Sequence, residues 1–109
     1  MARYSRAREK LADAEYRLAV SEGDVRERLR RAYLPLRSLR PEELPLPLRR
    51  ELREILEEMT RLGPARAPDG VVYLTAIEHT MSRIRNHTAR KMAERIYRLH
   101  ARLSRNVQT

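Results

Sequence analysis

Residues 87–104, HTARKMAERIYRLHARLS, decide what kind of fold this chain adopts. Apolar side chains recur in this stretch every three or four residues, at Met92, Ile96, Leu99 and Leu103. An α-helix has about 3.6 residues per turn, so this spacing places the four side chains on one helical face. The stretch therefore predicts a long amphipathic helix that buries one face against the rest of the protein.

The same spacing recurs along most of the remaining chain, interrupted by prolines and glycines. Thr75 and Asn86 are residue types that favour helix N-termini, and they precede the last two periodic segments. A single helix over 75–104 is the alternative, because the periodicity continues through residues 85–87. The expected helices are residues 4–20, 24–33, 47–62, 75–85 and 87–104. We predict an all-α fold, a compact bundle of four to five helices that forms a single domain over residues 1–109.

Two segments depart from the helical pattern. Residues 35–47 contain four prolines with leucines between them, which predicts an ordered connection held against the core, with a helical turn at Pro41. Pro35 is expected to end the second helix, since proline cannot donate a backbone hydrogen bond. Residues 71–74 have the composition of a strand, but we find no second run for it to pair with and expect no sheet.

The composition excludes several classes of protein. The chain has 109 residues and no cysteine, so disulfides, cysteine-ligated zinc and thiol nucleophiles are absent. No apolar run approaches the ~20 residues of a membrane span, and the N-terminus lacks the apolar segment of a secretory signal. The three histidines are too widely spaced to suggest a metal site. We expect a cytoplasmic protein with no membrane partner, no metal and no cofactor.

The charge is strongly basic and unevenly distributed. Lys and Arg number 24 against 15 Asp and Glu, a formal net charge of +9. Five cations share one face of the last expected helix and form what we call the basic row: Lys91, Arg95, Arg98, Arg102 and Arg105. A shorter set on the first helix consists of Arg3, Arg6 and Lys10. Aligned cations of this kind are typical of surfaces that contact nucleic-acid phosphates without reading sequence. We predict a small non-enzymatic accessory protein that binds nucleic acid in this way.

An acidic row on the third helix offers a different use for these cations. Glu51, Glu54 and Glu58 are spaced so that they share one helical face. They could pair with the basic row inside the bundle or across a homodimer. The alternative function is therefore a protein-interaction or homodimerisation module that docks an acidic partner.

Tyrosine supplies every aromatic side chain, because Phe and Trp are absent. We expect most of the five tyrosines to fill the core. Tyr97, which lies among the cations of the last helix, is the best candidate for stacking on a nucleic-acid base.

One spacing points to an enzyme. Arg95-x-x-x-x-His100 resembles the Arg-x4–6-His motif of HEPN-type ribonucleases, which are small all-α proteins that act as dimers. The resemblance covers six residues, and it departs from the family at Ile96, where a polar residue is usual. It implies that Arg95 and His100 of two protomers would hold a phosphate and handle protons at the RNA 2′-hydroxyl. A HEPN-like ribonuclease is the second alternative.

Overall fold

The computed structural model describes the backbone of residues 4–108 and the side chains of residues 4–105. Its helices are α1 (Ser5–Val20), α2 (Val25–Leu36), the short 3-10 helix η1 (Pro41–Glu43), α3 (Leu46–Met59), α4 (Ala76–Arg83) and α5 (Asn86–Gln108). Two short strands, β1 (Ala65–Arg66) and β2 (Val72–Leu74), lie between α3 and α4. The predicted all-α bundle is confirmed.

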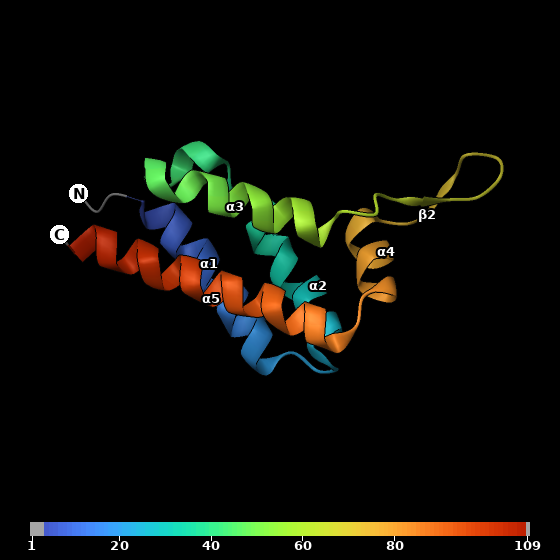
Figure 1. The fold of residues 1–109 in the computed structure, drawn as a ribbon, viewed down its shortest axis with the longest axis horizontal. Helices are drawn as coiled ribbons and strands as arrows, with labels where there is room; N and C mark the ends of the chain where they lie inside the picture. Colours follow the sequence, from blue (N-terminus) through green and yellow to red (C-terminus); the bar gives the residue numbers. More distant parts are fainter. Residues whose placement is uncertain (1–3, 109) are drawn as a thin grey trace.

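The helix α5 runs along much of the molecule, which measures 52 Å in its longest dimension (Figure 1). It packs against α1, α2 and α3. The start of α1 and the end of α5 lie at one end of the molecule, and the β1–β2 hairpin projects from the other. None of the described helices is long and apolar enough to cross a membrane.

The apolar face of α5 forms the centre of the core. Met92, Ile96, Leu99 and Leu103 are all buried, as their spacing predicts. They pack in one cluster with the buried leucines, alanines and other apolar side chains of α1, α2 and α3. The amphipathic pattern of α5 therefore explains why three helices gather around it.

The helix boundaries differ from the expected ones by a few residues. The largest differences are at three C-terminal ends: α2 ends at Leu36 rather than at residue 33, α3 ends at Met59 rather than at 62, and α5 continues to Gln108 rather than ending at 104. The break between the last two helices is confirmed, because Ile84 has an extended backbone and α5 begins at Asn86. Asp24 caps α2, where its side chain accepts hydrogen bonds from the backbone N–H groups of Arg26 and Glu27.

The expectation that Pro35 ends the second helix is wrong, because α2 continues to Leu36. Pro35 lies in the last turn of α2, so its missing N–H costs only one helical hydrogen bond. Its ring is buried, and this packing offsets the loss. The connection that follows is ordered as predicted, with Leu39 and Leu44 buried and a helical turn at η1.

The expectation of no sheet is also wrong. β2 pairs in an antiparallel manner with β1, and Ala65 lies opposite Leu74. The turn between them depends on Gly70, which has a φ of +88°, and on Asp69, which accepts a hydrogen bond from the Val71 N–H. β1 has only two residues, which are too few to be recognised as a strand from their side chains alone. The sequence therefore shows no sign of a partner for β2.

Candidate nucleic-acid interface

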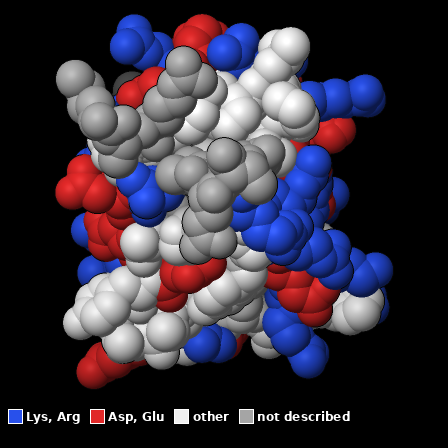
Figure 2. Space-filling model, turned by 90° about the vertical axis from the view of Figure 1, so that its left-hand side faces the viewer, with Lys and Arg blue, Asp and Glu red and all other residues white. Residues whose placement is uncertain are grey.

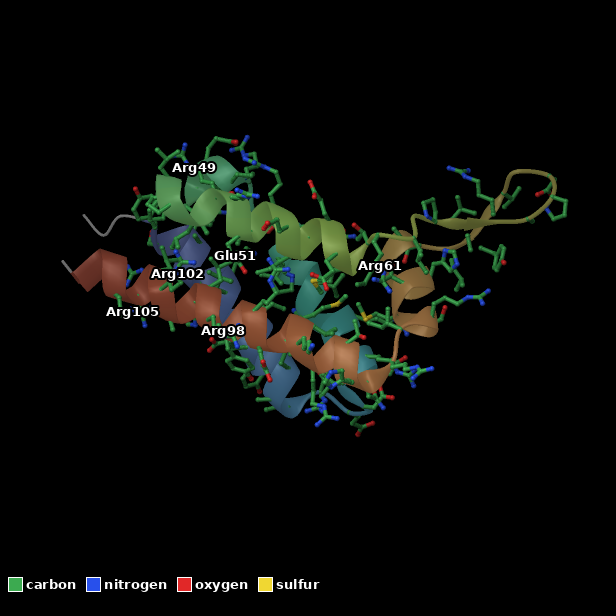
Figure 3. All side chains as sticks on the ribbon, in the orientation of Figure 1. Arg49, Glu51, Arg61, Arg98, Arg102 and Arg105 are labelled. Atoms are coloured by element: carbon green, nitrogen blue, oxygen red, sulfur yellow. The ribbon has the colours of Figure 1, made fainter. Side chains whose placement is uncertain are left out.

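The solvent face of α5 carries most of the basic row. Lys91, Arg98 and Arg105 are exposed, and Arg98 makes a loose ion pair with Glu94 at 3.4 Å. Arg102 is also exposed and has an interaction of its own within the protein. Figure 3 shows Arg98, Arg102 and Arg105 along the C-terminal half of α5. The structure therefore places four of the five predicted cations on an accessible helical surface.

Arg95 is different, because it lies in the seam between α5 and α3. Its guanidinium lies 2.9 Å from a carboxylate oxygen of Glu51, 3.7 Å from Glu54 and 2.7 Å from Glu58, and its side chain is only 25% exposed. The hydrogen bond to Glu51 is the main reason why the pKa of Arg95 is raised above its ordinary value. Arg95 of the basic row is thus paired with the acidic row of α3. This is the pairing inside the bundle that the sequence suggested as an alternative.

The basic residues of α1 face a different neighbour. The guanidinium of Arg6 pairs with Glu43 of η1 and donates to the carbonyl oxygen of Ser38. Lys10 is half-buried on the same helix, and Arg3 lies outside the described residues. Arg6 and Arg95 are thus each engaged by a carboxylate of a neighbouring element, Arg6 by η1 and Arg95 by α3.

His100 forms a contact between α5 and α1. Its Nδ1 lies 2.9 Å from a carboxylate oxygen of Glu15, and both side chains are mostly covered. Arg95 and His100 are five residues apart on one helix, which separates their directions by about 140°. Within one chain they therefore point to opposite neighbours, α3 and α1, rather than to a common site.

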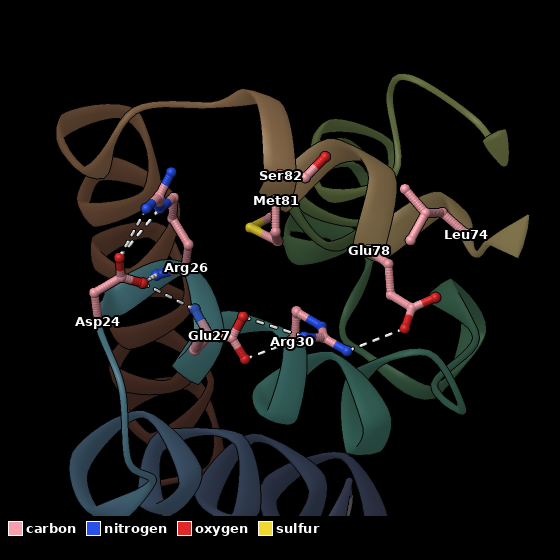
Figure 4. Close-up of a pocket in the computed structure, with 8 residues that line it drawn as sticks. All are labelled: Asp24, Arg26, Glu27, Arg30, Leu74, Glu78, Met81 and Ser82. Carbon is pink, nitrogen blue, oxygen red and sulfur yellow. Dashed lines mark hydrogen bonds and ion pairs between the residues drawn. The ribbon is translucent and has the colours of Figure 1, made fainter.

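A polar pocket between α2 and α4 is the functional candidate that the sequence analysis missed. Its volume is about 350 Å³, and Arg30 crosses it to reach Glu27 and Glu78, each at 3.1 Å (Figure 4). At its rim Asp24 pairs with Arg26 at 3.0 Å. Arg30 of α2 and Glu78 of α4 are 48 positions apart in the sequence, so no sequence motif marks their contact. This ion pair links α2 to α4, whereas the pairs Arg30–Glu27 and Asp24–Arg26 are local to α2 and its N-cap.

The surface charge as a whole is mixed rather than uniformly basic. Figure 2 views the end of the molecule that carries the start of α1 and the end of α5, where Lys and Arg gather on one flank and carboxylates are interspersed elsewhere. Among the described residues, no three His, Asp or Glu side chains are grouped as metal ligands.

No protein-family model, curated protein or solved structure matches this chain. Its function therefore has to be inferred from the side chains described above.

Three carboxylates make the fold sensitive to acid. Hydrogen bonds lower the pKa of Asp24, mainly from the Arg26 side chain, of Glu43, mainly from the Arg40 backbone, and of Glu78, mainly from the Thr75 backbone. At a pH between the lowered pKa values of the folded state and the ordinary pKa values of the unfolded state, the folded state therefore binds fewer protons. Their stabilising effect is present above the ordinary pKa values of 3.8 for Asp and 4.5 for Glu, and it is lost as the pH falls through the lower folded values.

We therefore expect the melting temperature to fall as the pH is lowered from about 4.5 towards 3. Circular dichroism melts at half-unit pH intervals measure this. The double variant Asp24→Asn with Glu78→Gln, which removes two of the three titrating groups, should show a shallower decline. A melting temperature that is constant between pH 5 and pH 3 would contradict this assignment.

Proposed function

We propose that this protein is a small non-enzymatic accessory protein that contacts nucleic-acid phosphates through the outer face of α5. The observation that supports the proposal is the exposed set Lys91, Arg98 and Arg105 on that face. From residue 86 to 105, Glu94 is the only carboxylate on this helix. Lys91 and Arg105 are 14 residues apart, about 21 Å along a helix, which is long enough to reach several phosphates of one strand.

Phosphate contact without sequence recognition suits this geometry. The cations lie on a packed helix whose opposite face is buried, so the helix cannot enter a groove freely as a recognition helix does. Tyr97 is 43% exposed. It lies about 100° around the helix from Arg98, towards α1. This direction does not favour a base stacking on Tyr97 while a phosphate contacts Arg98. The binding should therefore depend on charge and salt rather than on base identity.

A salt titration with matched charge variants tests this proposal. Wild-type protein should bind generic duplex DNA or RNA at low salt, with an affinity that falls about as the third power of salt concentration if three phosphates are neutralised. The triple variant Lys91→Glu, Arg98→Glu, Arg105→Glu should lose most of this binding.

The control is a triple variant with the same change in charge at exposed arginines outside α5, namely Arg31→Glu, Arg37→Glu and Arg83→Glu. It should keep most of the affinity. Equal losses in the two triple variants would mean that only net charge matters and would contradict the proposal. Binding to polyglutamate but not to DNA or RNA would favour the acidic protein partner instead.

The ribonuclease alternative stays a prediction, and its two residues are engaged elsewhere in the monomer. Arg95 is held by three glutamates, and His100 by Glu15. Cleavage of RNA by the wild type and its loss in His100→Ala would be needed to support this activity. Unchanged RNA after prolonged incubation with wild-type protein would end it.

A further inference from the structure

The outward faces of α1 and α5 carry an apolar surface that is unusual for so charged a chain. Tyr16 on α1 is 65% exposed and Tyr97 on α5 is 43% exposed. Tyr73 on the hairpin is exposed as well, so the expectation that most of the five tyrosines fill the core is wrong. Exposed small and apolar side chains lie one turn from them. We call this set the tyrosine face: Ala12, Tyr16, Ala19, Val20, Tyr97 and Ala101.

The contact between His100 and Glu15 places the two halves of this face side by side. Tyr16 follows Glu15 by one residue and Tyr97 precedes His100 by three. The two helices run in opposite directions, since the start of α1 and the end of α5 lie at the same end of the molecule. Along the shared axis the tyrosines are therefore offset by about 3 Å, at 1.5 Å per residue. Both lie on the solvent side of the seam that His100 and Glu15 mark.

Two charged residues lie at one end of the tyrosine face. Glu22 follows α1, and Arg90 lies near the start of α5 on the same side as Tyr97, seven residues away. Both are exposed, and neither forms an ion pair with another side chain among residues 4–105. At this end the face thus has one acid on its α1 half and one base on its α5 half. Two further exposed acids border the face, Glu9 one turn from Ala12 and Glu94 one turn from Tyr97, and Glu94 is paired with Arg98.

We propose that a second copy of this chain docks on the tyrosine face. In the dimer, α1 of one copy lies along α5 of its partner about a twofold axis that runs roughly parallel to both helices. This symmetry places Tyr16 near the partner's Tyr97 and Glu22 opposite the partner's Arg90, and each contact occurs twice. A symmetric partner therefore places apolar side chains against apolar ones and an acid against a base.

The exposed tyrosines supply a substantial part of the area that a dimer interface needs. A tyrosine buries about 150–250 Å² when fully covered, so four partly exposed tyrosines supply several hundred Å² of the ~1,200–2,000 Å² typical of stable interfaces. The alanines and Val20 add to this area. Lys91 and Arg98 lie about 100–120° around α5 from Tyr97 and stay accessible in the dimer, whereas Arg105 lies one turn from Ala101, at the edge of the tyrosine face. Dimerisation can be measured without nucleic acid, so the inference does not depend on the proposed function.

Analytical ultracentrifugation over a range of concentrations tests the proposal. The wild type should approach twice the chain mass of 12.9 kDa, and the variant Tyr16→Glu with Tyr97→Glu should sediment as a monomer with an unchanged circular dichroism spectrum. Tyr73→Glu is the control, since Tyr73 is 66% exposed but lies on the hairpin, and it should remain dimeric. A wild type that is monomeric at every concentration, or a double variant that dimerises like the wild type, would overturn the proposal.

A charge exchange tests the orientation of the two copies. Arg90→Glu should weaken dimerisation by about tenfold, because two weak ion pairs per dimer become repulsive. Adding Glu22→Arg should restore the wild-type affinity. A double variant no tighter than Arg90→Glu alone would overturn the arrangement of α1 against the partner's α5.

Discussion

Replacing Leu99 by alanine should lower the free energy of unfolding by about 2–5 kcal/mol, the usual cost of truncating a fully buried leucine. Leu99 is 0% exposed and lies on the α5 face that packs against three other helices. Its removal leaves a cavity that these helices cannot close without shifting together. This is a large part of the total stability of a domain, which is about 5–15 kcal/mol.

Urea denaturation followed by circular dichroism measures this loss. The matched control is Leu46→Ala, which makes the same chemical change at a side chain that is 74% exposed. The control should change the free energy of unfolding by less than about 0.5 kcal/mol. Similar losses in the two variants would mean that the apolar face of α5 is not the centre of the core.

Replacing Arg95 by alanine should lower the free energy of unfolding by about 1–3 kcal/mol, the range for charge-assisted hydrogen bonds that are partly shielded from water. The variant removes the cation that holds Glu51, Glu54 and Glu58, so the three carboxylates repel one another beside the core. The ion pair between Arg98 and Glu94 is exposed, so Arg98→Ala should cost less than about 1 kcal/mol. Parallel urea titrations at pH 7 compare the two variants.

The salt dependence of this loss identifies its cause. Added salt screens the repulsion among the three carboxylates, so the deficit of Arg95→Ala relative to the wild type should shrink as the salt concentration is raised. A deficit that stays constant as salt is added would show that the lost packing of the arginine stem, rather than charge, accounts for the change.

The main features of the fold follow from local patterns. The apolar spacing of α5 is long and regular, and it requires a buried helical face wherever the helix is placed. The hairpin depends on two short strands whose partners are determined by the turn and by the packing of α4, so the pattern of residues 71–74 alone does not reveal it. Pro35 illustrates a similar limit, because its tolerance in α2 depends on burial that only the assembled bundle provides.

The sequence predicted which charged residues share a helical face at the candidate site, but not which neighbouring element each side chain contacts. Spacing alone identified the cations that share one face of α5 and the acidic row of α3. Arg95 lies about 70° around the helix from the centre of the apolar face, close to the boundary between core and solvent. Whether such a residue faces solvent or a neighbouring helix depends on which helix packs there, and this neighbour is α3 with its glutamates. The direction of Arg6 towards η1 has the same kind of tertiary cause.

The salt dependence of nucleic-acid binding in two single variants tests the proposed division of the charge most directly. Arg95 lies in the seam between α5 and α3, and we propose that Lys91 contacts nucleic acid. We expect Lys91→Gln to lower the slope of log affinity against log salt by about one, while Arg95→Gln lowers stability but leaves the slope of the folded protein unchanged. A lower slope in Arg95→Gln together with an unchanged slope in Lys91→Gln would contradict this division of the charge.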